Sequence, residues 1–195
     1  MNRHISFNQY RMIDLSILAA FLAGSQCLIF FASSRWYPEQ LYVVSPVAAM
    51  VALVMMRWNG YAAIHAALGG VIFTALSGGS WQHFVIYGVG NLCSMAALAM
   101  FKIFGKERIR KDTFLTLTFA LCVQLLMQLG RAGLAALFGA PAAACLGFIT
   151  TDILSELFTL FIIWVVRRIE GLFEDQKHYL LRTQSEQLVE GRDQF

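Results

Sequence analysis

KIFGKERIRK, residues 102–111, separates two long apolar runs and decides the fold. The segment carries five Lys or Arg residues, whereas the residues before it, from 84, and after it, to 138, are largely apolar. A membrane-spanning helix needs about 20 mainly apolar residues. We therefore predict spanning helices over 84–104 and 113–138, with the basic loop on one side of the membrane.

Further apolar stretches extend this pattern along the chain in both directions. The predicted spanning helices cover residues 13–33, 41–56, 61–78, 84–104, 113–138 and 144–166. Hydrophobic residues make up 58% of the chain, charged ones 14%, and the mean hydropathy is +0.61, whereas a soluble domain has roughly 45–50% apolar residues. The sequence thus predicts an all-α, polytopic integral membrane protein with six transmembrane helices.

Basic residues alternate between the loops and set the orientation. Arg11 precedes the first helix, Arg57 separates the second from the third, and Arg167 and Arg168 follow the sixth. Because Lys and Arg beside short loops stay on the cytoplasmic side, both termini and the 102–111 loop are predicted to be cytoplasmic. We expect a multi-pass protein of a bacterial cytoplasmic (inner) membrane.

The chain divides at about residue 168. Residues 1–168 form the predicted six-helix membrane domain, and residues 169–195 form a charged cytoplasmic tail that continues the sixth helix. A solvated amphipathic extension and a docking segment for a cytoplasmic partner are both compatible with the tail. The net charge of +3 lies in the cytoplasmic loops, so it indicates contact with anionic lipid and no nucleic-acid binding.

The sequence contains no motif of a common enzyme class. The patterns HExxH, GxxxxGK[ST] and GxSxG are absent, so we expect a protein that is not an enzyme and cannot hydrolyse ATP alone. Cys27, Cys93, Cys122 and Cys145 lie in apolar spans without CxxC spacing. We interpret them as packing residues and expect neither a metal site nor a permanently bound cofactor.

Small residues at four-residue spacing mark helix faces that approach each other closely in lipid. The first helix carries Ala19 and Ala23, and the third carries Ala62, Ala66 and Gly70. Such a face serves either the internal bundle or a partner protein, and the spacing does not decide between the two.

Polar side chains inside predicted spans are costly in lipid and therefore indicate functional positions. Gln124, Gln128 and Arg131 share one face of the fifth helix, and Asp152 and Glu156 are four residues apart on the sixth. Arg131 and Asp152 lie at similar depth on helices joined by a short turn, so we predict an ion pair. Either this pair is a structural clip, or Arg131 stays available to a substrate while Asp152 orients it.

Polar and aromatic residues of other helices lie at the same outer depth. His83, Tyr87 and Asn91 recur every four residues on the fourth helix, and Gln26 lies on the first. We expect an outward-facing pocket for a planar ligand with polar edges. The predicted substrate-binding residues are Gln26, Trp36, Tyr37, Trp81, His83, Tyr87, Asn91, Gln128, Arg131 and Asp152. His65, near the inner end of the third helix, is interpreted as a hydrogen-bonded packing residue.

Four segments stand out together along the chain: LAAFLAG at 18–24, WNGYAAIHAALGG at 58–70, YGVGN at 87–91 and LGRA at 129–132. With the six-helix pattern, over about residues 10–168, they resemble the substrate-binding S components of energy-coupling factor (ECF) vitamin transporters. This resemblance implies a six-helix protein that captures a micronutrient from outside. The loop between the first two helices, with Trp36 and Tyr37, would close over the ligand.

The resemblance also implies partners. An S component docks through its first helix, here Ala19 and Ala23, on a membrane coupling protein with two cytoplasmic ATPase subunits, and topples to release its ligand inside. A flavin, pterin, modified purine, haem or corrinoid would suit the aromatic residues with His83 and Arg131. The rival hypothesis is a membrane scaffold or sensory module, such as a rod-shape scaffold protein, that acts through residues 169–195.

Overall fold

The computed structural model describes residues 6–36 and 44–192, with side chains as far as residue 185. Every regular element in these ranges is helical. The stretches long and apolar enough to cross a membrane are Phe7–Trp36, Val47–Leu76, Trp81–Phe104, Thr113–Leu137 and Ala142–Val166. The chain is therefore all-α in its described part and compatible with a multi-pass membrane protein.

Most of these stretches are subdivided. α1 (Phe7–Trp36) and α7 (Thr113–Leu137) are uninterrupted. The second stretch comprises α2 (Val47–Trp58), η1 (Asn59–Tyr61) and α3 (Ala62–Leu76), and the third comprises α4 (Trp81–Phe84), η2 (Val85–Val89), η3 (Asn91–Leu98) and α5 (Ala99–Phe104). The short α6 (Lys106–Lys111) leads into α7, and α8 (Ala142–Thr150), α9 (Ile153–Val166) and α10 (Gln176–Arg192) complete the chain.

α2 and α3 fold back on each other. Asn59 has a φ of 53°, a left-handed conformation that ends α2. Val47, at the start of α2, lies against Gly69 of α3, where a Cβ would be 2.6 Å from Cγ1 of Val47. The ranges 41–56 and 61–78 thus correspond to two helices, but α2 begins only at Val47. The residues 37–43 that precede it lie outside the described part of the chain.

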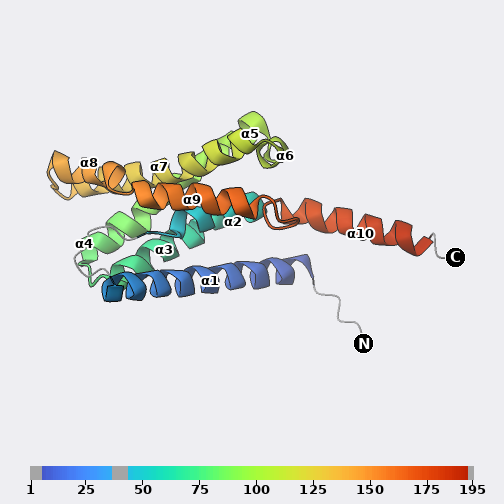
Figure 1. Ribbon diagram of the computed structural model, residues 1–195, viewed down its shortest axis with the longest axis horizontal. Helices are drawn as coiled ribbons and strands as arrows, with labels where there is room; N and C mark the ends of the chain where they lie inside the picture. Colours follow the sequence, from blue (N-terminus) through green and yellow to red (C-terminus); the bar gives the residue numbers. More distant parts are fainter. Residues whose placement is uncertain (1–5, 37–43, 193–195) are drawn as a thin grey trace.

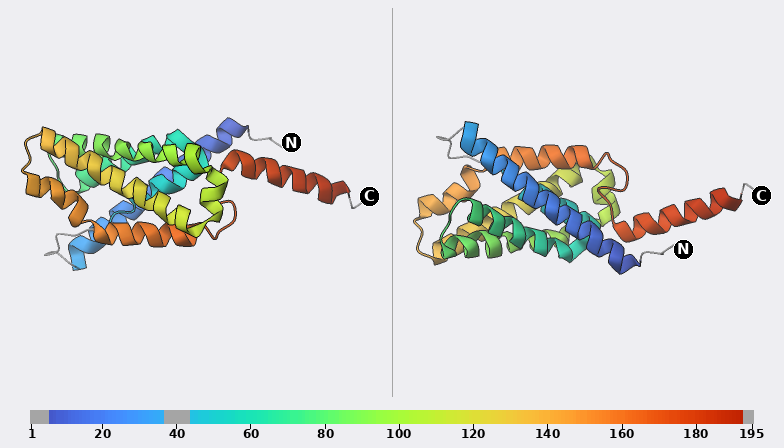
Figure 2. Two further views of the ribbon diagram at one scale, coloured as in Figure 1. Left: turned by 90° about the horizontal axis from the view of Figure 1, so that it is seen from above. Right: turned by 90° about the horizontal axis from the view of Figure 1, so that it is seen from below.

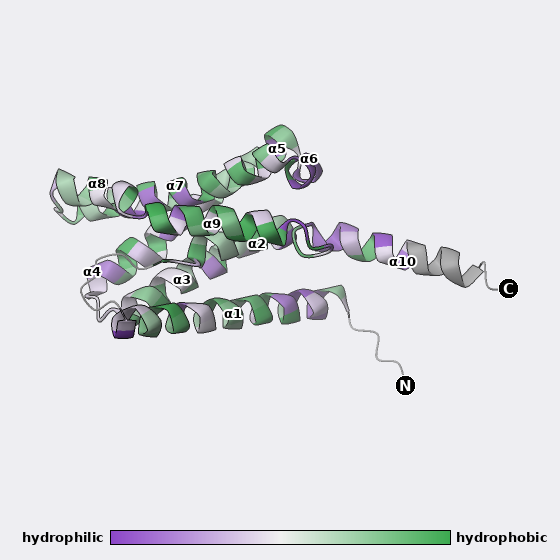
Figure 3. Cartoon of the chain, viewed as in Figure 1, coloured by the Kyte–Doolittle hydropathy of each residue, from purple (hydrophilic) through white to green (hydrophobic). Residues whose placement is uncertain are grey.

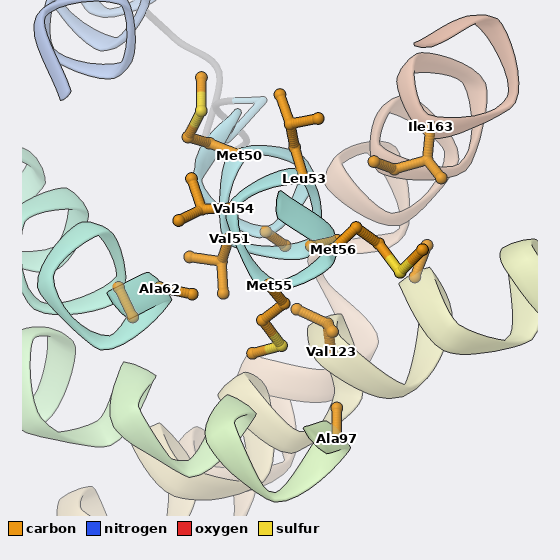
Figure 4. Close-up of a cluster of buried hydrophobic side chains, with 14 of the residues drawn as sticks. Met50, Val51, Leu53, Val54, Met55, Met56, Ala62, Ala97, Val123 and Ile163 are labelled. Carbon is orange, nitrogen blue, oxygen red and sulfur yellow. The ribbon is translucent and has the colours of Figure 1, made fainter. Parts of the chain in front are cut away.

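α2 occupies the centre of the bundle. All 12 of its residues are buried, and α1, α3, α7 and α9 contact it. Figure 4 shows side chains such as Val51 and Met55 extending from α2 toward Ala62 of α3 and Val123 of α7. A helix enclosed by protein needs no lipid-facing surface, so α2 can be shorter than a helix that faces lipid.

α1 lies across one face of the bundle, in contact with α2 and α3 (Figure 2, right). Its buried stripe includes Leu15, Leu22 and Gln26, while Phe21 and Leu28 on the outward side are exposed. Hydrophobic residues prevail along the helices of the bundle, whereas hydrophilic ones prevail in the described side chains of α10 (Figure 3). Large apolar side chains are exposed on α1, α7 and α9, as contact with lipid would require.

The start of α1, α6 and α10 lie at one end of the molecule, and α4 and the turn between α7 and α8 lie at the other (Figure 1). α9 ends at Val166, and α10 begins at Gln176 after a connection in which Gly171 has a φ of 72°. The prediction that the tail continues the sixth helix is therefore wrong. α10 is a separate helix that projects from the bundle (Figure 2).

Candidate functional site

Two helix interruptions bring polar side chains together inside the bundle. Val85–Val89 form a π-helical turn that carries Tyr87, and such turns occur often at functional sites. The predicted span 144–166 lies within the apolar stretch Ala142–Val166, but its helix is interrupted at Thr151 and Asp152, and Asp152 precedes the first turn of α9. Interrupted helices with polar groups at the break are typical of binding sites within membranes.

Glycines allow the π-helical turn to lie directly against its neighbours. A Cβ on Gly70 of α3 would overlap the carbonyl group of Tyr87, and a Cβ on Gly130 of α7 would overlap the carbonyl oxygen of Gly90. Backbones approach this closely only where side chains are absent. The contact places the π-helical turn beside Arg131, whose backbone nitrogen would be 2.9 Å from a Cβ on Gly90.

Arg131 is held by side chains from η2, η3 and α7. Its Nε donates to Oδ1 of Asn91 at 2.7 Å, and its terminal nitrogens donate to Oε1 of Gln128 at 3.2 Å and to Sδ of Met127 at 3.3 Å. The ring of Tyr87 covers the guanidinium, with a distance of 5.1 Å from Cζ to the ring centroid. Arg131 is only 7% exposed, so its contacts fix it in one position.

The predicted ion pair between Arg131 and Asp152 is confirmed, although the distance between the two charged groups is long. Nη1 of Arg131 is 3.8 Å from Oδ2 of Asp152, longer than the roughly 2.7–2.9 Å of a charge-assisted hydrogen bond. The same oxygen accepts hydrogen bonds from Nε2 of Gln124, at 3.0 Å, and from Nε2 of Gln128. The polar face of α7 therefore converges on Asp152.

These residues line a cavity of about 140 Å³. Its lining consists of Ser45, Val47, Gly69, Phe73, Tyr87, Gln128, Arg131, Phe148, Thr151 and Asp152. An adjoining cavity of about 20 Å³ shares Ser45 and Phe73 and is also lined by Gln26. A compact group of aromatic, amide and charged side chains around a cavity is suited to binding a small polar molecule.

Six of the predicted binding residues lie in or beside these cavities. Tyr87, Gln128, Arg131 and Asp152 line the larger one, and Gln26 lines the smaller one, where its Nε2 donates to the carbonyl oxygen of Gly69 at 3.1 Å. Asn91 lies behind Arg131. Its Nδ2 donates to the carbonyl oxygen of Ala66 at 2.9 Å, and its Oδ1 accepts from Nε of Arg131. Asn91 therefore positions the guanidinium without lining the cavity itself.

Other predicted residues lie elsewhere. Trp36 is 72% exposed at the end of α1, and Trp81 packs edge-on against Phe138 at 5.5 Å. His83 is exposed, and its Nδ1 accepts the backbone N–H of Ser80 at 3.1 Å, which caps α4. Tyr37 lies outside the described residues. The cavities are therefore formed without Trp36, Trp81 or His83.

His65 has the packing role predicted for it. It is 1% exposed, and its Nε2 lies 3.2 Å from the carbonyl oxygen of Leu15. Sequence reasoning missed Ser45, Phe73, Phe148 and Thr151. Aromatic residues are common in any apolar span, but the polar run from Thr150 to Asp152 could have indicated a break in the helix.

A second polar cluster lies at the opposite end of the bundle. Arg57, only 6% exposed, donates to both carboxylate oxygens of Asp14, at 3.0 and 2.7 Å, and to the carbonyl oxygens of Gly171 and Leu172, at 2.8 and 2.9 Å. Nε1 of Trp58 also donates to Asp14, at 2.5 Å. Arg57 therefore joins α1 and α2 to the connection before α10, a role that its position in a basic loop does not indicate.

Lys106 extends this junction to α6. Its Nζ donates to the carbonyl oxygen of Met56 at 3.0 Å and to Asp175 at 2.7 Å. Burial lowers the pKa of Lys106, against the effect of Asp175. Burial raises the pKa of Asp175, but the hydrogen bond and the charge of Lys106, together with backbone hydrogen bonds from Lys177 and His178, lower it overall. A cavity of about 540 Å³ lies between α6 and the start of α10.

Within the described part of the chain, no three His, Cys, Asp or Glu side chains gather in a way that could hold a metal ion. The chain matches none of the models of known protein families, and no similar curated protein or solved structure is found.

Proposed function

We propose that the chain is the substrate-binding S component of an ECF-type ABC importer. It captures a planar micronutrient from outside and delivers it with a membrane coupling protein and two ATPase subunits. The observation that supports this function best is the cavity between the π-helical turn of Tyr87 and the helix break at Asp152. Buried polar groups at membrane depth are costly, and a binding function explains why Arg131, Gln128 and Asp152 converge there.

In this proposal the chain crosses the membrane six times, with both termini in the cytoplasm. α6 lies at the end where α1 starts (Figure 1); there Arg57 bonds to Asp14 of α1 and Arg167 bonds to the carbonyl oxygen of Lys111 of α6, as expected of basic residues in cytoplasmic loops. α1, of 30 residues, is about 45 Å long, so it crosses a hydrocarbon core of about 30 Å with a tilt. The cavity, lined by Phe148 of α8 and by Ser45 ahead of α2, then lies toward the outer side.

The coupling protein docks, in this proposal, on α1. Ala19 and Ala23 are half-buried beside the contact of α1 with the bundle, and Ala20 and Gly24 continue the same small-residue surface into full exposure. A Cβ on Gly24 would meet no atom within 4 Å. The backbone of another helix could therefore approach this surface closely.

Native mass spectrometry of the detergent-purified protein tests the binding function directly. We expect a retained small molecule in the wild-type spectrum and its loss in Arg131→Ala. A wild-type protein without a bound mass, and without thermal stabilisation by any member of a panel of vitamins and haem, would contradict the proposal, because a ligand that binds only the folded state must stabilise it.

Docking is tested with a double substitution, Ala20→Leu with Gly24→Leu. We expect it to abolish uptake and copurification of the coupling protein while the ligand is still bound, because bulky side chains prevent close helix approach. Leu28→Ala, on the same exposed side of α1, is the matched control and should leave docking intact.

The second candidate function is a membrane scaffold or sensory module that acts through α10. Arg57 favours it, because its bonds to Gly171 and Leu172 link the connection before α10 rigidly to the bundle. Removal of residues 176–195 distinguishes the two functions. A binding subunit should retain its ligand and uptake, whereas a scaffold should lose its function.

A further inference from the structure

The size of the cavity restricts the ligand that the proposed binding subunit can take. The main cavity has about 140 Å³ and the adjoining one about 20 Å³. An apolar cavity of about 150 Å³ accommodates benzene. A single substituted ring therefore matches the space between Phe73, Tyr87 and Asp152, whereas a tetrapyrrole is several times too large.

Three aromatic rings surround this space. The centroids of Phe73 and Tyr87 are 4.8 Å apart with the rings tilted, and those of Tyr87 and Phe148 are 5.9 Å apart in an edge-on arrangement. All three residues line the cavity and come from separate elements, α3, η2 and α8. Aromatic faces attract cations through the negative potential of their π-systems, so this enclosure favours a planar, positively charged group.

The charges of the site favour the same kind of ligand. Arg131 directs its N–H groups to Asn91, Gln128 and Met127 and is 7% exposed. The side chain of Asp152 is 18% exposed, and its closest approach to Arg131 is 3.8 Å. The carboxylate, more than the guanidinium, is therefore the charged group that the cavity presents to a ligand.

Gln26 supplies a second hydrogen-bond acceptor, in the adjoining cavity that shares Phe73 with the main one. It is 5% exposed and lines the adjoining cavity, and its Oε1 has no hydrogen-bond partner among the described residues. A buried amide oxygen without a partner costs stability. A donor group on a ligand that extends past Phe73 would satisfy it.

We propose that the site selects a monocyclic, planar cation, such as a ring that bears an amidinium or a protonated ring nitrogen. The ring lies among Phe73, Tyr87 and Phe148, its positive edge faces Asp152, and a donor at the opposite end reaches Gln26. This inference rests on the proposed binding function and goes beyond it by assigning the size and the charge of the substrate.

Three probes of the same shape and different charge test the assignment: benzamidinium, benzamide and benzoate. Their effects on the thermal midpoint of the purified protein are measured over a range of concentrations, because stabilisation follows the affinity for the folded state. We expect benzamidinium to bind at least about tenfold more tightly than the other two probes. Asp152→Asn should abolish this preference, and Glu156→Gln, one turn along α9, should preserve it.

A further variant keeps the test valid if Asp152→Asn does not fold. Phe148→Leu removes one ring of the enclosure without touching the bonds of Arg131, and it should weaken benzamidinium binding. Tighter binding of benzoate would overturn the inference and identify Arg131 as the group that recognises the charge of the ligand. Equal binding of all three probes, or no binding of any, would overturn it as well.

The results that would contradict the assignment of a monocyclic cation differ from those that would contradict the binding function itself. A flavin, haem or corrinoid retained by the purified protein would overturn the assignment of a monocyclic cation while it supported a substrate-binding subunit. A protein that retains no small molecule, and whose uptake is unaffected by substitutions at Arg131 and at Ala20 with Gly24, would contradict the binding function itself.

Discussion

Gly130 of α7 lies against the backbone of Gly90, so closely that a Cβ on Gly130 would overlap the carbonyl oxygen of Gly90. The residue after Gly130 is Arg131, and the residue after Gly90 is Asn91, which binds the Nε of Arg131 at 2.7 Å. The close backbone contact therefore sets the distance between the side chain of Asn91 and the guanidinium of Arg131.

Gly130→Ala should separate η2 and η3 from α7 and lower the thermal midpoint. Forcing an extra carbon into such a contact costs about 1–3 kcal/mol. Gly133→Ala, on the same helix, is the control, because its Cβ would meet no atom within 4 Å and alanine favours a helix more than glycine does. Equal thermal midpoints for the two variants would show that the Gly130 contact does not restrain the bundle.

Arg131→Ala should destabilise the protein by up to about 3–5 kcal/mol, because it leaves the partly buried carboxylate of Asp152 without a cation. The double variant Arg131→Ala with Asp152→Asn should recover part of this loss, since the uncompensated charge is gone. Thermal unfolding of the single and double variants gives the coupling between the two residues. Additive effects of the two substitutions would mean that the ion pair, at 3.8 Å, does not contribute to stability.

The helices could be predicted from the sequence because an apolar run of membrane-spanning length can satisfy its backbone groups in lipid only as a helix. The interruptions do not follow from the apolar runs, although the polar residues from Thr150 to Asp152 indicate one of them. The π-helical turn at Val85–Val89 accompanies a contact of Tyr87 with Gly70 of α3, and the break at Asp152 accompanies bonds from Gln124 and Gln128 of α7. Both depend on distant segments.

Among the site residues, the polar ones in apolar spans are those that the sequence predicts. Gln128, Arg131 and Asp152 stand out because polar side chains are rare in apolar spans, whereas Phe148 does not. His83 fits the four-residue period, but its bond with the backbone of Ser80 is a local alternative that the period does not reveal. Contacts at long sequence distance, such as Arg57 with Asp14, leave no sign in the spacing of either residue.

Arg57→Ala should release the connection before α10 from the bundle. The substitution removes the bonds of Arg57 to Asp14, Gly171 and Leu172 and leaves a largely buried carboxylate with less compensation. We expect faster proteolytic cleavage between residues 167 and 176, measured by mass spectrometry of the fragments. Arg57→Lys should not restore protection, because an ammonium group cannot replace the two-pronged guanidinium.

The exposed Arg35 at the end of α1 provides the control for this experiment. Arg35→Ala removes the same charge but none of these bonds, so its cleavage should match that of the wild type. Cleavage of Arg57→Ala at the wild-type rate would show that other contacts, such as that of Tyr10 with Gln176 at 2.9 Å, hold the connection alone.

Acid should loosen the junction of α6 with the start of α10. Burial raises the pKa of Asp175, but its hydrogen bond and ion pair with Lys106, together with the backbone N–H groups of Lys177 and His178, lower it below 3.8, and the pKa of Glu107 is lowered from 4.5 chiefly by Arg110. A group with a lowered pKa stabilises the folded state above its unfolded pKa, and this stabilisation is lost as the pH falls through the folded value. The junction should therefore be stable near neutrality and weaken below about pH 4.

Hydrogen exchange of residues 170–176, expressed as protection factors between pH 3 and pH 7 to remove the intrinsic effect of pH, measures this loosening. The wild type should lose protection as the pH falls, whereas Asp175→Asn should be less protected already at neutral pH and change less. Glu170→Gln is the matched control, because Glu170 is 79% exposed and pairs only at 3.2 Å with Arg182. If Asp175→Asn kept the pH dependence of the wild type, the contact of Asp175 with Lys106 would not be the acid-sensitive one, and Glu107, whose pKa is also lowered, would be the remaining candidate.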